Sequence, residues 1–99
     1  PVTNIFHDIK STFMNINKLI TIVKKKLQEK IKIEHINIED KSFLHKNHIG
    51  NQAGKYHLKV IIESKELKEL SKIQSNKKIY RVLSDEMKEF IHSIQILII

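Results

Sequence analysis

Residues 42–59, SFLHKNHIGNQAGKYHLK, follow one stretch with the alternation of a β-strand and end inside a second one, and therefore decide how the chain folds. The second stretch, residues 55–63 (KYHLKVIIE), alternates between polar and apolar side chains and then becomes apolar, as a half-buried strand does. The first, residues 35–40 (HINIED), also alternates. Both glycines of the chain fall between the two runs, where positive φ angles are easily accommodated. We predict two sheet strands joined by a long, shaped loop that places three histidines in or beside it: His45, His48 and His57.

Length and composition limit the class of protein. Ninety-nine residues suffice for one small domain. The chain has no cysteine, so a metal would have to bind His, Asp or Glu, or a thiolate from a partner. A net charge of +7 favours nucleic acid or an acidic partner, but Arg81 is the only arginine, and readers of phosphates and bases favour arginine. No apolar run is long enough for a membrane span, so no membrane partner is expected.

The rest of the chain shows helical and strand periodicity. Apolar residues from 16 to 27 follow the spacing of one helix face, which predicts a helix beginning after Asn15. Ser64 is expected to cap a single helical turn, and a second long helix is predicted between residues 73 and 88. Alternation then returns, which predicts a third strand with five residues on one face: Phe90, His92, Ile94, Ile96 and Ile98. Residues 1–14 are interpreted as an N-terminal extension or frayed tail, and residues 15–99 as the domain.

The order helix, strand, strand, turn, helix, strand is an α+β pattern. The first two strands are expected to pair antiparallel. The helix before the third strand permits a right-handed crossover, which would make the second and third strands parallel. We predict a three-stranded mixed sheet covered on one face by helices.

Several segments resemble the BolA-like protein family, over roughly residues 24–96. Residues 39–45 (EDKSFLH) resemble its acidic-Ser-x-x-His motif, and residues 56–60 (YHLKV) resemble its x-His-Phe-Lys-Val strand. Residues 79–94 match its late helix and its Val-His-Ala-Leu strand, which reads IHSI here. The chain departs from the family in two places: LKE at 67–69 replaces Phe-x-Gly, and SNK at 75–77 replaces Arg-His-Arg.

The resemblance implies a KH-like (class II) αββααβ fold and a non-enzymatic adaptor of iron-sulfur cluster assembly or iron regulation. The expected partner is a monothiol glutaredoxin, in a heterodimer that shares a [2Fe-2S] cluster. Glutaredoxin and glutathione would supply thiolates, and this chain would supply His45 and His92, with His48 as a substitute for His45. The isolated chain is expected to hold no cofactor. The expected location is intracellular: cytoplasmic or nuclear, or alternatively mitochondrial.

Alternatives from other classes stay open. His57 alternates away from its apolar neighbours, so we expect it to make a supporting hydrogen bond behind the metal ligands. A stand-alone zinc site could be built from four histidines, but their irregular spacing disfavours it: His45, His48, His57 and His92. A DNA-binding regulator, which the family also includes, would use four lysines: Lys55, Lys59, Lys77 and Lys78. It ranks second because the chain lacks a Gly-x-x-Gly clamp.

The chain has no cysteine nucleophile and no glycine-rich phosphate loop, so we predict that it is not an enzyme.

Overall fold

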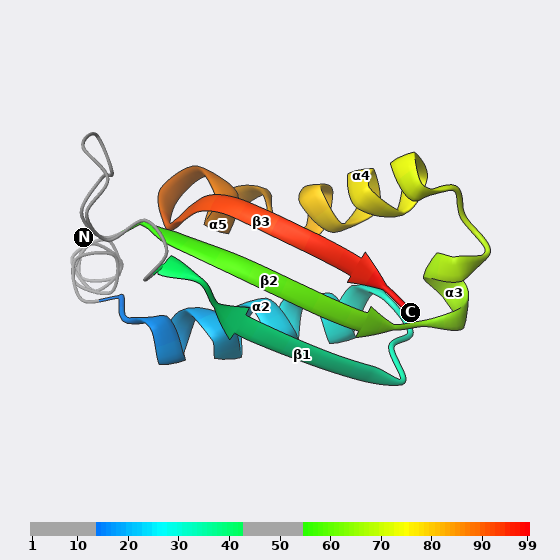
Figure 1. Ribbon diagram of the computed structural model, residues 1–99, viewed down its shortest axis with the longest axis horizontal. Helices are drawn as coiled ribbons and strands as arrows, with labels where there is room; N and C mark the ends of the chain where they lie inside the picture. Colours follow the sequence, from blue (N-terminus) through cyan, green and yellow to red (C-terminus); the bar gives the residue numbers. More distant parts are fainter. Residues whose placement is uncertain (1–13, 43–54) are drawn as a thin grey trace, which may run out of the picture.

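The structure, a computed structural model, describes residues 14–42 and 55–99. The predicted tail, except for Met14, and the loop residues 43–54 with His45 and His48 lie outside the described residues. The elements follow one another along the chain as shown in Figure 1: α2 (Ile16–Lys30), β1 (His35–Asp40), β2 (Tyr56–Glu63), α3 (Lys65–Lys68), α4 (Lys72–Val82), α5 (Ser84–Glu89) and β3 (Ile91–Ile98). This order confirms the predicted α+β class.

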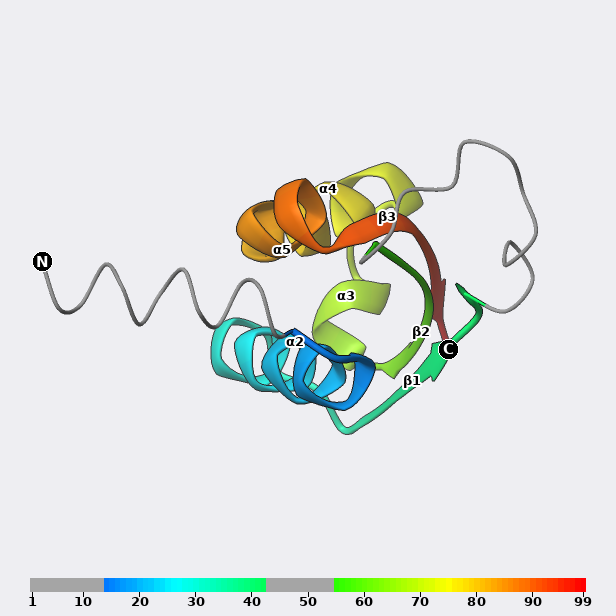
Figure 2. The same ribbon diagram turned by 90° about the vertical axis from the view of Figure 1, so that its left-hand side faces the viewer.

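The sheet has the predicted mixed topology, with β2 in the centre. β1 pairs antiparallel with β2, so that Ile38 lies opposite Val60 and Glu39 opposite Lys59. β3 lies on the other side of β2 and runs parallel to it. Figure 2 shows the labelled helices together on one side of the sheet, as expected, and this leaves the opposite face of the strands without a helix from the described part of the chain.

The core forms where α2 and the other helices cover β2. Asn15 caps α2 as predicted, because its side-chain Oδ1 accepts a hydrogen bond of 2.9 Å from the Lys18 N–H. The face of α2 that packs inward consists of Leu19, Val23 and Leu27, and each is completely buried. Burying one such side chain contributes about 1.5–3 kcal/mol. The other buried apolar residues extend this cluster over the sheet: Ile31, Ile38, Leu58, Val60, Ile62, Leu67, Ile79, Leu83 and Ile91.

The prediction of one helix over residues 73–88 was wrong, because the helix divides into α4 and α5 at Leu83. Leu83 has φ −98° and ψ 18°, outside the helical region. Its N–H still donates to the Ile79 carbonyl at 3.0 Å, and its own carbonyl accepts from the Met87 N–H at 2.8 Å. The apolar stripe therefore runs on through the break, and Leu83 is fully buried there.

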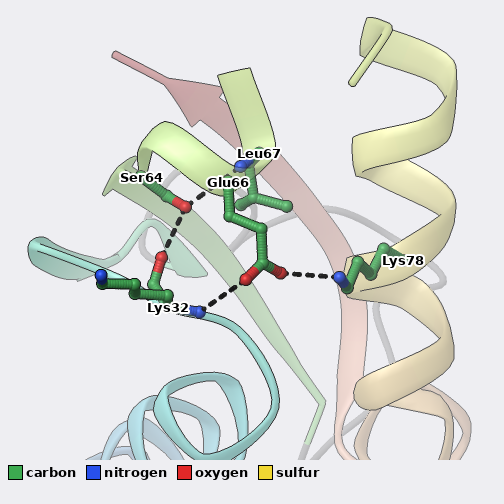
Figure 3. Close-up of polar contacts among 5 residues, drawn as sticks. All are labelled: Lys32, Ser64, Glu66, Leu67 and Lys78. Carbon is green, nitrogen blue, oxygen red and sulfur yellow. Dashed lines mark hydrogen bonds and ion pairs between the residues drawn. The ribbon is translucent and has the colours of Figure 1, made fainter. Parts of the chain in front are cut away.

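Polar contacts connect α3 with the segment that follows α2 and with α4 (Figure 3). Ser64 caps α3 by accepting from the Leu67 N–H at 3.1 Å, and its hydroxyl donates to the Lys32 carbonyl at 2.7 Å. Glu66 accepts from the Lys32 N–H at 3.3 Å and from the Lys78 ammonium at 2.6 Å. The hydrogen bond from Lys78, followed by the one from the Lys32 backbone, lowers the pKa of Glu66 below its ordinary value of 4.5. Ser64 and Glu66 thus connect three segments that are distant in sequence.

The start of β3 departs from regular pairing. Tyr56 of β2 lies opposite Ile91, but the next residue, His57, lies opposite Ser93. One residue of β3, His92, is therefore extra, which is the definition of a β-bulge. Because of the bulge, Ile91 and Ile94 both contact the core although three positions separate them. The predicted face that His92 would share with Ile94 is thus interrupted.

Within residues 14–42 and 55–99, no helix combines the length and the apolar composition that crossing a membrane requires.

Candidate functional site

His57 lies at the end of the sheet at which β2 and β3 begin, and several contacts hold it there. It is only 5% exposed, although its side chain lies on the face of β2 opposite to Leu58 and Val60. Its backbone N–H donates to Ser42 Oγ at 3.0 Å, and its carbonyl accepts from the Lys41 N–H at 2.7 Å. Its ring Nδ1 lies 2.7 Å from Ser93 Oγ, within hydrogen-bond distance. Backbone and ring of His57 are therefore both held in place.

His92 lies beside this buried ring and is itself exposed. The two imidazole centroids are 4.9 Å apart, and the ring planes are tilted by 54°. The bulge explains this contact, because an extra residue in a strand changes the direction of its side chain relative to regular alternation. The exposed imidazole contacts a buried one, so His92 can offer a ring nitrogen to an external partner, while its neighbours Ile91 and Ser93 are paired with β2.

β1 ends at the same end of the sheet, next to His57. Asp40 Oδ1 accepts a hydrogen bond of 2.9 Å from the Ser42 N–H, so Asp40 fixes the residue that contacts His57. Tyr56 leads into β2 from the other side, and its N–H donates to the Phe90 carbonyl at 2.8 Å. Both positions that flank residues 43–54 therefore lie at the sheet end that carries His92.

The described residues can supply part of a metal site. His92 provides an exposed imidazole, a nitrogen ligand of the kind that iron and zinc accept. Within the two described ranges, no three His, Asp or Glu side chains converge in a geometry that could hold an ion. His45 and His48 lie outside the described residues, and His57 contributes a ring nitrogen to Ser93. At this end of the sheet, the described residues therefore offer one exposed imidazole, that of His92.

The four lysines proposed for nucleic acid do not converge on one face. Lys59 lies opposite Glu39, on the sheet face turned away from the described helices. The pKa of Glu39 is lowered by a hydrogen bond from Lys41 and by the Lys41 charge, and the Lys59 charge lowers it further. Lys78 is paired with Glu66. Lys55 precedes β2, and Lys77 is exposed on α4.

A groove on the helical side, which sequence reasoning missed, has two lysines among the nine described residues that line it. It lies between α3, the start of α4 and the end of β3, and its volume is about 360 Å³. Lys68 and Lys72 line it, and neither forms an ion pair with another described residue. The two segments that depart from the family pattern contribute Leu67, Lys68, Ser75 and Asn76 to its walls. Their shared departure was the signal that could have located the groove.

Comparisons with known proteins agree with this architecture. The family model described as "BolA-like protein" matches residues 27–99. A curated relative from Haemophilus influenzae, named "DNA-binding transcriptional regulator BolA", is 30% identical over 73 residues, which cover 74% of this chain and 68% of the relative. Among solved structures, the BolA domain of SufE1 from Arabidopsis thaliana superposes with a TM-score of 0.67 at 24% identity, covering 79% of this chain and 86% of that domain. BolA1 from the same plant gives a TM-score of 0.66 at 25% identity, with the same coverage.

Proposed function

Because the chain belongs to the BolA-like family, we propose that it is a non-enzymatic adaptor for iron-sulfur cluster assembly or iron regulation. In this proposal it binds a monothiol glutaredoxin and shares a [2Fe-2S] cluster with it through histidine. The observation that carries the proposal is the exposed His92 imidazole, which rests on the buried ring of His57 at a bulge of β3. This is an accessible nitrogen donor on a fixed backbone.

The chemistry of the donors supports the proposal. A bound cluster would accept electrons one at a time, and replacing thiolate by neutral imidazole on one iron raises its reduction potential. This chain has no cysteine, so its own contribution is histidine. His92 would provide one nitrogen, and His45, or His48 in its place, would provide the second. Glutaredoxin and glutathione would provide the thiolates.

The sheet lowers the entropic cost of presenting the ligand. The backbone of His92 is held between Ile91, which is 2% exposed, and Ile94, which packs against the core. A ligand on such a strand has little backbone freedom to lose when it binds. His92 should therefore contribute more of the binding than a ligand carried on the residues between Ser42 and Lys55.

The proposal is tested by mixing the protein with a monothiol glutaredoxin, ferrous iron, sulfide and glutathione. We expect a heterodimer in gel filtration and a visible circular dichroism spectrum that differs from that of glutaredoxin alone. His92→Ala should abolish this difference, because it removes the fixed donor. The matched control is His35→Ala, since His35 is 83% exposed and pairs with Glu63 at the opposite end of β2. No heterodimer and an unchanged spectrum would refute the proposal.

A second candidate function is binding to DNA. It is supported by the name of the Haemophilus influenzae relative and by the groove whose walls carry Lys68 and Lys72. Lysines that contact phosphates release counterions, so affinity falls steeply as salt increases. We expect Lys68→Gln together with Lys72→Gln to weaken binding and reduce the salt slope by about 2 if both contact phosphates. Lys25→Gln on the exposed side of α2 is the control. If the groove substitutions leave the DNA affinity and its salt dependence unchanged, this candidate function is refuted.

A further inference from the structure

Ser93 is a polar residue where the family pattern has alanine, and it lies directly after the bulge of β3. It lies opposite His57 on the sheet face without described helices, and its Oγ is 2.7 Å from His57 Nδ1. A serine hydroxyl can both donate and accept, so this contact suits either tautomer of the imidazole. The hydroxyl of Ser93 is therefore a feature of this chain that the family resemblance does not supply.

The Ser93 contact acts on the ring of His57, whereas two other hydrogen bonds act on its main chain. The hydrogen bonds from His57 N–H to Ser42 Oγ and from Lys41 N–H to the His57 carbonyl fix its backbone. Both act on main-chain atoms, whereas the position of the ring depends on rotation about its side-chain bonds. The bond to Ser93 restricts that rotation, because a distance of 2.7 Å requires Nδ1 to face β3.

The orientation of His57 in turn bears on His92. The two rings are in contact, with centroids 4.9 Å apart, and the His92 side chain is exposed on its other side. If the buried ring turned, the surface on which His92 rests would change. Groups behind a metal ligand that fix its orientation typically affect metal affinity 10- to 100-fold.

We infer that Ser93 is a positioning residue: it holds the His57 ring, and through that ring it holds the His92 imidazole in the orientation that presents a nitrogen to the shared cluster. The inference rests on the proposed function for the identity of the bound group. The geometry itself lies entirely within the described residues. Ser93 touches neither the cluster nor the partner in this scheme.

The experiment compares wild type, Ser93→Ala, Ser93→Thr and the control Gln95→Ala. Gln95 is the next residue of β3 on the same face and is exposed. The first readout uses the protein alone: nuclear Overhauser contacts between the His57 and His92 rings, with the nitrogen shifts of both rings. The second uses the reconstituted complex with glutaredoxin: the lifetime of the shared cluster against a chelator, and its reduction potential.

We expect Ser93→Ala to weaken the contacts between the rings, to shorten the cluster lifetime by about tenfold or more, and to shift the potential. Ser93→Thr keeps the hydroxyl and should restore both readouts, and Gln95→Ala should match wild type. Unchanged ring contacts in Ser93→Ala overturn the positioning role. Weakened contacts with an unchanged lifetime and potential overturn the link to the ligand. If wild type forms no shared cluster, the proposed function fails and the ligand role with it, whereas the first readout still decides whether Ser93 holds the rings.

Discussion

Replacing Lys26 by methionine should destabilise the domain by more than the loss of a surface ion pair. Lys26 lies on α2, and its ammonium is 2.7 Å from Glu86 Oε2 on α5 and 3.9 Å from Asp85 Oδ2. The side chain of Glu86 is only 9% exposed, and its Oε1 is buried without a hydrogen-bond partner in the described part of the chain. Lys26 is therefore the charged partner of a carboxylate that water scarcely reaches.

The burial of Glu86 determines how much stability the Lys26→Met substitution should cost. An exposed pair contributes about 0–1 kcal/mol, whereas removing one partner of a buried pair costs about 3–5 kcal/mol. Lys26 is 38% exposed, so water reaches this pair from one side and the effect should lie between these limits. We expect Lys26→Met to lower the free energy of unfolding by about 1–3 kcal/mol.

Thermal and urea unfolding measure the effect. A loss of about 2 kcal/mol should lower Tm by roughly 8–16 °C in a domain of this size. Lys25→Met is the matched control, because Lys25 is exposed on the same helix, and it should change stability by less than about 0.5 kcal/mol. Adding Glu86→Met to Lys26→Met should recover stability, since it removes the buried charge. If Lys26→Met behaves like the control, or if the second substitution recovers nothing, the reasoning about Glu86 is wrong.

The other predictions concern α3 and the ligands. The folded-state pKa of Glu66 is lowered, so its stabilisation is present above the unfolded value and is lost as pH falls through the folded value. The difference in Tm between wild type and Glu66→Gln should therefore shrink from neutral pH to about pH 3, and a constant difference would contradict it. Ser64→Ala should cost about 1–2 kcal/mol in urea unfolding, because it removes a cap and a buried hydrogen bond. The exposed Ser84→Ala should cost little, and equal losses would refute the capping argument. His45→Ala should weaken the shared-cluster spectrum, whereas His92→Ala abolishes it; the reverse order would show that His92 is not the principal ligand.

The sequence predicted the elements whose signals are local. The cap at Asn15 and the apolar spacing up to Leu27 located α2, and alternation located β1 and β2 closely. The parallel pairing of β2 and β3 followed from the helix between them. The helix and the first two strands depend on residues that are near one another in sequence, and the parallel pairing follows from a general rule for crossover connections, so one chain is enough to infer them.

The break between α4 and α5 and the bulge at His92 depend on packing between distant segments. Leu83 continues the apolar stripe of its helix, and no glycine or proline marks the position at which the helix divides. The bulge arises where Ile91 and Ile94 must both reach the core, which the alternation of β3 does not reveal. The register with β2 is needed to find it.

The sequence likewise predicted only part of the candidate site. The histidines could be singled out by type, but the contact between Ser93 and His57 requires the pairing of two strands and joins residues that are 36 positions apart. The groove likewise requires α3, α4 and β3 to be brought together. The two departures from the family pattern point to part of its walls, including Lys68, but they do not distinguish Lys72 from the many other lysines.

The most direct test of the central claim is nitrogen hyperfine spectroscopy on the reduced, shared cluster. The protein would carry ¹⁵N-labelled histidine, and the glutaredoxin and glutathione would be unlabelled. We predict a ¹⁵N coupling of the strength expected for a ligating nitrogen, retained in His35→Ala and lost or replaced in His92→Ala. A cluster that forms with both proteins present but shows no ¹⁵N coupling would contradict the claim that this chain binds it through histidine.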